Sequence, residues 1–166
     1  LVSPTLEQLA RGLAGVTLED IRWLRCDIKS TALLAAVMLR QQAAEQGSDE
    51  AILVRDGRLA EGSSSAVFVV KNGLVATPPA SCERLPSITR QVIGDVLTAL
   101  DLPLAEREIA TDELADMDEI WIASATREAC AVTQLDDRPV GNGRPGPVWH
   151  RVYREFQALK QRECEA

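Results

Sequence analysis

A lysine stands where a charged segment meets an apolar one, and this is the first position that could do chemistry. Lys29 lies in the stretch RCDIKST, just before the apolar run ALLAAVML. A neutral lysine amine is a nucleophile that forms Schiff bases with carbonyl groups, and desolvation lowers the pKa of an amine toward neutrality. Because Ile28, Leu33 and Leu34 are apolar, we expect this amine to be partly desolvated. Most lysines are solvated surface residues, so the pattern alone does not distinguish the two cases.

A carboxylate followed by three hydroxyl groups is the second such feature. Glu61 opens the stretch EGSSSAVFVV, which leads into a strongly apolar run. An inward-facing carboxylate surrounded by hydroxyls can hold a protonated ring nitrogen. The alternative is an ordinary polar loop between two strands, which the composition favours when this stretch is taken by itself.

Two further motifs suit the binding of an anion. In LPSITRQVI, Ser87 can cap a helix whose first amides belong to Ile88 and Thr89, and free amides with the helix dipole attract anions. In IWIASATREA, a buried strand ends in the small residues Ser124 and Ala125, as strands that line ligand clefts do. Each motif is equally typical of a plain helix cap or turn. His150, the only histidine, is interpreted as a surface or packing residue.

The elements that must position these residues alternate between strands and helices. We expect a short strand at 19–24, then a helix capped by Ser30 or Thr31 that ends at Gly47. The dipeptides Asp56-Gly57 and Asn72-Gly73 separate β-rich runs and predict an antiparallel meander. Later elements are a helix after Ser87, a strand in LAEREIA, a helix start at Thr111, strands in EIWIAS and ACAVTQL, and a helix from Pro147 with Val148, Val152, Phe156 and Leu159 on one face. Hairpins among alternating elements predict a mixed sheet in an α/β fold.

Composition limits the class of protein. The chain has 166 residues, a net charge of −7, 46% hydrophobic and 26% charged residues, which suits one globular domain. The negative charge argues against nucleic acid or an anionic membrane as the main partner. No apolar run is long enough to span a bilayer. Four cysteines without a C-x-x-C pair, and one histidine, make a metal site improbable and fit a reducing cytoplasm.

Taken in order, these stretches resemble one known family. The segments DIRWLRCDIKS, EGSSS, LPSITRQVI, MDEIWIASATRE and PVGNGRPGPV resemble the class IV (fold-type IV) pyridoxal-phosphate aminotransferases. RCDIKS with EGSSS favours the D-amino-acid (D-alanine) aminotransferase branch over its sisters, the branched-chain aminotransferases and the aminodeoxychorismate lyases. The resemblance covers nearly the whole chain from about Gly15 onward and implies a mixed sheet with hairpins, partly closed as a barrel and flanked by helices.

The resemblance also implies roles for the residues above. Lys29 matches the lysine that binds pyridoxal 5'-phosphate as a Schiff base and moves the substrate's α-proton, and Glu61 matches the carboxylate that pairs with the pyridine nitrogen. The remaining matched positions are Ile88, Thr89 and Ser124 at the phosphate, Leu85 against one ring face, Ser63, Ser64 and Ser65 around the ring, and Arg22 in support of the glutamate and serine network.

Three positions depart from the family pattern. Ala125 replaces a threonine that is common after the serine, so one phosphate contact is either missing or moved to Thr126. Ser87 replaces a glycine, which matters little at an N-cap. Ala66 replaces an asparagine that often follows the serine run, and its side-chain hydrogen bond is lost.

The family also has an N-terminal domain that this sequence does not match. Leu1 is not a methionine, and we expect residues 1–166 to be the C-terminal cofactor-binding domain of a longer protein. The parent reaction implied is transamination between a D-amino acid such as D-alanine and a 2-oxo acid such as 2-oxoglutarate, in a homodimer. We expect the isolated chain to bind the cofactor weakly and to transaminate poorly. The contrasting hypothesis is a non-catalytic globular domain in which Lys29 and Glu61 are incidental.

Overall fold

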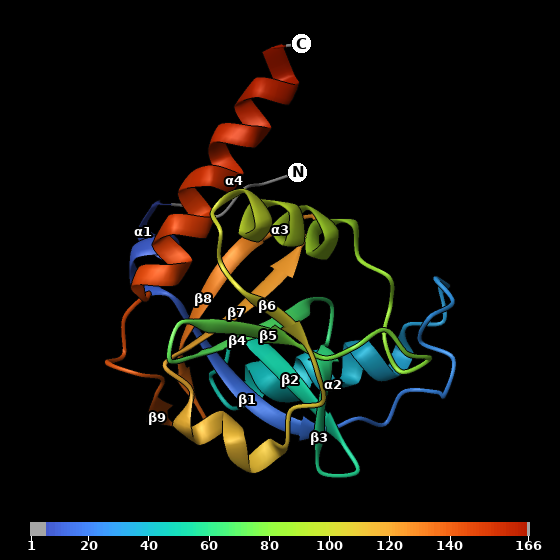
Figure 1. The fold of residues 1–166 in the computed structure, drawn as a ribbon. Helices are drawn as coiled ribbons and strands as arrows, with labels where there is room; N and C mark the ends of the chain where they lie inside the picture. Colours follow the sequence, from blue (N-terminus) through green and yellow to red (C-terminus); the bar gives the residue numbers. More distant parts are fainter. Residues whose placement is uncertain (1–5, 166) are drawn as a thin grey trace.

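A nine-stranded mixed sheet forms the centre of the structure, a computed structural model that describes residues 6–165 (Figure 1). The strands are β1 (Leu13–Glu19), β2 (Glu50–Arg55), β3 (Arg58–Gly62), β4 (Ala66–Lys71), β5 (Leu74–Thr77), β6 (Leu104–Glu106), β7 (Glu119–Ser124), β8 (Glu128–Leu135) and β9 (Arg138–Pro139). The helices are α1 (Leu6–Arg11), α2 (Leu34–Glu45), α3 (Ile88–Ala99) and α4 (Pro147–Glu165), with a 3-10 helix η1 (Thr111–Asp116).

The sheet curls until its two ends approach each other. The strand order is β3-β2-β1-β8-β7-β4-β5-β6, and β9 pairs with β8. The amide of Leu59 in β3 donates to Ile109 O over 2.8 Å, and the amide of Thr111 donates to Gly57 O over 2.9 Å. The segment after β6 therefore bridges back to β3, and the expected partly closed barrel in a mixed α/β fold is confirmed.

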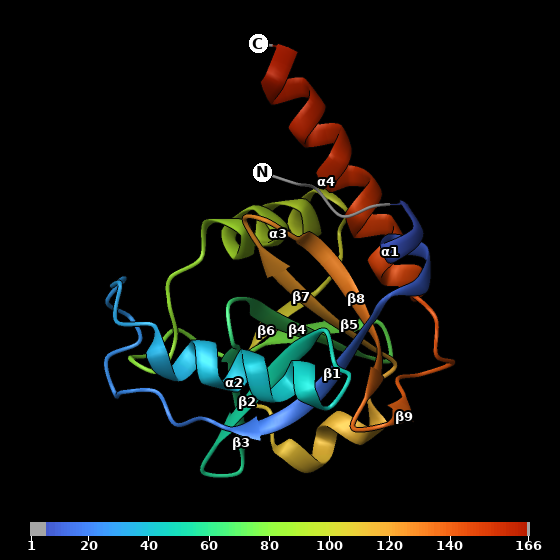
Figure 2. The same ribbon diagram turned by 180° about the vertical axis from the view of Figure 1, so that it is seen from behind.

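Apolar side chains cover the sheet in two clusters. The larger cluster places Ile93 and Leu97 of α3 and Trp149 and Val152 of α4 against the central strands. The smaller one places Leu39 and Ala43 of α2 against β2 and β3. Figure 2 shows α2 on the side of the sheet away from α3 and α4, whose far half extends beyond the domain. None of the helices in the described part of the chain has the length and apolar character needed to cross a membrane.

Both predicted turns form, but the predicted meander does not. Asp56 and Gly57 have φ values of 49° and 72°, and Asn72 and Gly73 have φ values of 50° and 78°, as expected of tight hairpin turns. They join β2 to β3 and β4 to β5 as antiparallel pairs. The next partner of β4 is β7, because the apolar face of β4 pairs along its whole length with that later strand.

Three local predictions are wrong. The strand expected at 19–24 lies earlier, as β1, since the Asp20 carboxylate accepts a hydrogen bond from the Arg22 amide (3.0 Å) and turns the chain there. Helix α2 begins at Leu34 rather than after Ser30 or Thr31, because Ser30 Oγ caps a local turn at the Ala32 amide (3.3 Å). Thr111 is the first residue of η1 and not its cap, since the Glu113 carboxylate accepts the hydrogen bond from the Ala110 amide (2.8 Å).

The other elements agree with the expectation in kind. Helix α3 begins after Ser87, whose Oγ accepts a hydrogen bond from the Arg90 amide at 3.2 Å. Helix α4 begins at Pro147, and β7 and β8 pair as an antiparallel hairpin. The strand predicted in LAEREIA shrinks to the three residues of β6.

A buried thiol in β8 gives the fold a testable alkaline limit. Burial raises the pKa of the Cys130 thiol from 9.0 to about 11. A raised pKa stabilises the native state below pH 9.0 and loses that contribution as the pH rises through about 11. We expect the wild-type chain to lose about 2–3 kcal/mol of unfolding free energy across this window relative to Cys130→Ala. Urea unfolding at pH 8 to 11.5 measures it; the exposed Cys164→Ala is the control, and parallel curves for all three proteins would contradict the expectation.

Candidate active site

The connection between β1 and α2 carries Arg22 and Lys29 and is fixed to a second connection. It leaves the body of the sheet beside the start of α2 (Figure 2). The Asp27 amide donates to Cys82 O over 3.3 Å, and Arg22 Nη2 donates to Glu83 O over 3.2 Å. Residues 82 and 83 lie between β5 and α3, so the segment with the lysine and the segment leading to the expected phosphate helix are held together.

Arg22 stands between two buried carboxylates. Its Nε donates to Asp20 Oδ1 and its Nη2 to Asp20 Oδ2, both over 2.8 Å, while its Nη1 donates to Glu61 Oε1. Asp20 Oδ2 also forms an ion pair with Arg55 Nη2 at 2.9 Å. Glu61 Oε2 accepts a further hydrogen bond from the Leu85 amide at 3.3 Å. The predicted support of Glu61 by Arg22 is therefore present as a direct contact.

Burial and charge act against each other in this cluster. Burial raises the pKa of Glu61, and the opposing effects of Arg22 and the Leu85 amide are smaller. Burial alone would also raise the pKa of Asp20, but its hydrogen bonds with Arg22 prevail and hold that pKa below its usual range. Burial disfavours the charged guanidinium of Arg22, yet its two carboxylate partners raise the pKa above the ordinary arginine value. Arg22 is shared unequally: Asp20 takes more of its charge, and Glu61 retains a demand for a second cation.

The three serines after Glu61 divide into two buried residues and one exposed residue. Ser63 donates from both its amide (3.1 Å) and its hydroxyl to Glu50 Oε1. Ser65 Oγ is buried and has no hydrogen-bond partner among residues 6–165. Ser64 is exposed. The loop between β3 and β4 is thus anchored on one side and offers an unsatisfied hydroxyl on the other.

The start of α3 is open to solvent. Ile88 is 73% exposed and Thr89 is partly exposed. Ser87 satisfies the Arg90 amide, while the amides of Ile88 and Thr89 are in the first turn, where no helical acceptor exists. Ser124, at the end of β7, accepts a hydrogen bond from the Arg127 amide at 3.1 Å, and Ala125 beside it is exposed.

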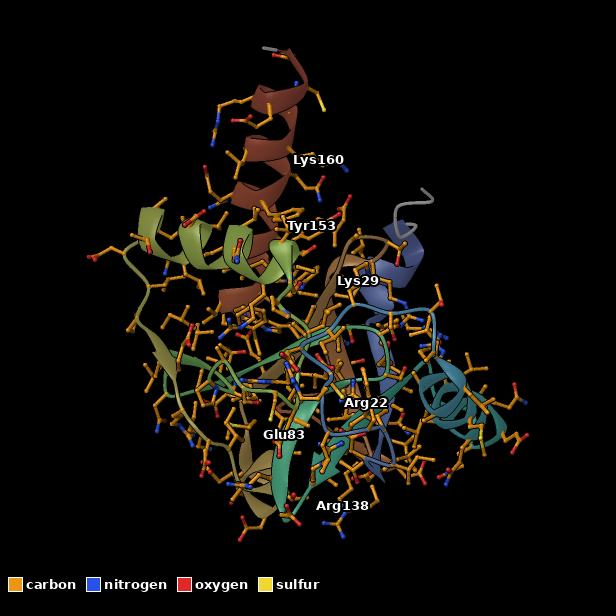
Figure 3. The ribbon with its side chains drawn as sticks, turned by 90° about the vertical axis from the view of Figure 1, so that its right-hand side faces the viewer. Arg22, Lys29, Glu83, Arg138, Tyr153 and Lys160 are labelled. Atoms are coloured by element: carbon orange, nitrogen blue, oxygen red, sulfur yellow. The ribbon has the colours of Figure 1, made fainter. Side chains whose placement is uncertain are left out.

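Lys29 lies on the surface of the connection (Figure 3). Its apolar neighbours are themselves exposed, with Ile28 at 45%, Leu33 at 56% and Leu34 at 73%. The expectation that they would desolvate the amine is therefore wrong for this chain, because they project outward instead of folding over it.

A cavity of about 150 Å³ opens between the strands and the connection before α3. Its walls include Glu61, Leu85 and Ser87, together with Thr77 and Arg90. Lys29 and Ser124 are outside it, so the candidate residues form a buried floor with an exposed rim rather than an enclosed pocket.

Four charged residues of this region escaped the sequence analysis: Asp20, Glu50, Arg55 and Arg127. Each contacts a candidate residue or its direct partner. The only sequence signal was the density of charge in LEDIRWLRCD, which places Asp20 two residues before Arg22. For Glu50 and Arg127 no local signal exists, since their partners lie 13 and 77 residues away.

Comparison with known sequences identifies relatives over almost the whole chain. Residues 2–135 match the family model described as amino-transferase class IV. A D-alanine aminotransferase of Bacillus licheniformis is 41% identical over 154 residues, which are 93% of this chain and 54% of that protein. A D-alanine aminotransferase of Staphylococcus aureus (strain COL) is 38% identical over 91% of this chain and 54% of its own length. This chain thus spans about half the length of these relatives.

Solved structures with the same fold include two branched-chain aminotransferases. A branched-chain amino acid aminotransferase from the organism abbreviated T.th., solved with pyridoxamine 5'-phosphate, superposes with a TM-score of 0.87 at 25% identity, over 92% of this chain and 52% of that one. The Escherichia coli branched-chain amino acid aminotransferase gives a TM-score of 0.81 at 27% identity, over 91% and 53%.

Proposed function

Because this chain belongs to the class IV aminotransferases, we propose that it forms the cofactor-binding part of a pyridoxal-phosphate enzyme that transfers amino groups between a D-amino acid, such as D-alanine, and a 2-oxo acid, such as 2-oxoglutarate. The observation that carries this proposal is the buried Glu61, held by Arg22 and the Leu85 amide at the floor of the site. The higher identity to D-alanine aminotransferases than to branched-chain aminotransferases supports the choice of substrate.

The residues present fit pyridoxal phosphate. Glu61 combines burial, a raised pKa and free lone pairs, so a protonated ring nitrogen would satisfy it. Ser65 Oγ is buried and unpaired within residues 6–165, and the first turn of α3 presents amides suited to a phosphate group. When bound, the cofactor supplies an electron sink for the negative charge that develops at the substrate α-carbon.

Each residue then has one task. Glu61 holds the proton on the ring nitrogen, and Arg22 keeps that carboxylate in place. Lys29 Nζ anchors the cofactor, then takes the α-proton from the substrate and returns it during the transfer. The amides of Ile88 and Thr89, with the Thr89 and Ser124 hydroxyls, hold the phosphate. Leu85 packs against one ring face, and Ser63 to Ser65 border the ring.

We further propose that a separate N-terminal domain covers Lys29 in the complete protein. Relatives are nearly twice as long as this chain, and apolar residues beside Lys29 are exposed here. Cover over these residues would desolvate the amine and keep it neutral near pH 7. The isolated chain is therefore expected to show no normal steady-state turnover.

Covalent trapping tests the site. The chain is mixed with increasing pyridoxal phosphate, reduced with borohydride, digested and mapped by mass spectrometry. We expect a saturable adduct at Lys29; no adduct there would favour a non-catalytic domain.

The substrate is tested separately in the protein that carries this chain. Pyruvate formed from D-alanine only when a 2-oxo acid is present indicates the proposed transamination. Pyruvate released from aminodeoxychorismate without an acceptor would instead indicate the lyase. Amino transfer from leucine or valine, but not from D-alanine, would indicate the branched-chain enzyme, which the structural similarity favours as the second candidate.

A further inference from the structure

A buried carboxylate outside the cofactor site joins the segments that build it. Glu50, the first residue of β2, is 0% exposed. It pairs with Gly15 in the parallel β1–β2 ladder, so its backbone belongs to the rigid sheet. None of the tasks assigned above uses it.

Each of its two oxygens serves a different part of the site. Glu50 Oε1 accepts hydrogen bonds from the Ser63 amide and hydroxyl in the loop between β3 and β4. Glu50 Oε2 accepts from Arg127 Nη1 at 3.3 Å, in the turn between β7 and β8, and from Arg40 Nη1 at 3.2 Å, on α2. One carboxylate therefore links the loop that follows Glu61, the turn that carries Ser124 and the helix that follows Lys29.

Arg127 transmits this link to the expected phosphate side. Its amide donates to Ser124 Oγ over 3.1 Å, and its Nη2 donates to Asp49 O over 3.1 Å. The turn from Ser124 to Arg127 is thereby fixed to the start of β2 through both the backbone and the side chain of the neighbouring acidic residues. The turn and the serine loop both lie between strands, so they depend on contacts of this kind to hold their shape.

The charges make the arrangement depend on Glu50. It places one buried negative charge between two guanidinium groups, and a neutral amide there would leave two cations facing each other with a single weak acceptor. The serine hydroxyl would lose a charge-assisted hydrogen bond at the same time.

We propose that Glu50 is a positioning residue for the cofactor site, which sets the relative placement of the Ser63–Ser65 loop and the Ser124–Arg127 turn. This inference rests on the proposed function. It assigns Glu50 no contact with cofactor or substrate; it acts through Ser63 and Arg127.

Glu50→Gln tests the proposal, with Glu119→Gln as a matched control. Glu119 is also buried, and it accepts hydrogen bonds from the Trp121 side chain and from the Val148 and Trp149 amides at the opposite end of β7. The readouts are the pyridoxal phosphate concentration that half-saturates borohydride trapping at Lys29, the absorption spectrum before reduction, and the melting temperature. Loss of a supporting residue of this kind typically costs about 10- to 100-fold in affinity.

We expect Glu50→Gln to raise the half-saturating concentration about tenfold or more and to change the spectrum, while Glu119→Gln lowers the melting temperature and leaves both cofactor readouts unchanged. Equal half-saturation in wild type and Glu50→Gln would overturn the inference and leave the proposed function standing. No adduct in the wild type would overturn the proposed function itself. If Glu50→Gln does not fold, Arg127→Gln decides, because it removes the link to the partly exposed turn alone; an unchanged half-saturation in that variant overturns the inference.

Discussion

Replacement of Lys29 by alanine is expected to abolish covalent attachment of pyridoxal phosphate and to have the largest functional effect of any single change in this chain. Removal of the proton-transfer group alone typically slows such a reaction by about 10²- to 10⁴-fold. Because Lys29 is exposed, its loss should change the unfolding free energy by less than about 0.5 kcal/mol. Trapping and peptide mapping on the chain, and D-alanine transamination by the protein that carries it, measure the two effects.

The chain provides a matched control for this experiment. It has three lysines, and the other two make ion pairs: Lys71 with Asp118 and Lys160 with Glu128. Lys71→Ala removes a lysine from a surface remote from the candidate residues and should leave the adduct at Lys29 intact. An adduct of unchanged yield on another lysine in Lys29→Ala would show that the site has been assigned to the wrong residue.

Glu61→Gln is expected to weaken cofactor binding and transamination by about 10²-fold or more, the size of effect seen when a preorganised electrostatic partner is removed. The glutamine keeps the shape of the side chain but cannot hold a proton on the ring nitrogen by charge. Arg22 should remain in place, since Asp20 retains its hydrogen bonds with Nε and Nη2. Glu113→Gln is the control, because Glu113 also pairs with an arginine, Arg107, but in η1.

The same variant has an opposite effect on the stability of the cofactor-free chain. Burial raises the pKa of Glu61 above 4.5, so its contribution to stability is complete below that pH and is lost as the pH rises through the folded-state pKa. Glutamine does not ionise and has no such loss. Urea unfolding from pH 4 to 8 should show Glu61→Gln gaining stability relative to the wild type as the pH increases. A difference that shrinks with rising pH would mean that Arg22 outweighs burial at this site.

Local patterns were enough to predict several elements of the fold. Ser87 with LPSITRQVI predicted α3, because a cap and a helical apolar period act over a few residues. Asp56-Gly57 and Asn72-Gly73 predicted two hairpin turns, because those residues tolerate positive φ values. The ordered motifs also placed Glu61 beside Arg22 through resemblance to a family, and the structure has that contact.

Other features depended on partners far away in the sequence. The neighbour of β4 is β7, about fifty residues later, which no turn signal in the β-rich stretch could indicate. The strand at 19–24 failed because Asp20 binds Arg22 and Arg55 instead of continuing the ladder. Lys29 was expected to be desolvated from the hydropathy of its neighbours, but hydropathy does not say which way those side chains point.

The sequence by itself determined the family, the types of chemical group and most local structure, because caps, turns and short motifs are written in adjacent residues. Only the tertiary structure decided how those groups are held. The curl of the sheet brings Arg22 to Glu61 and brings Ser63, Arg40 and Arg127 to Glu50, over separations of 10 to 77 residues. Hydrogen bonds of this kind depend on distance in space and leave no periodic or local trace in the chain, so the carboxylate that joins the candidate site could be found only after folding.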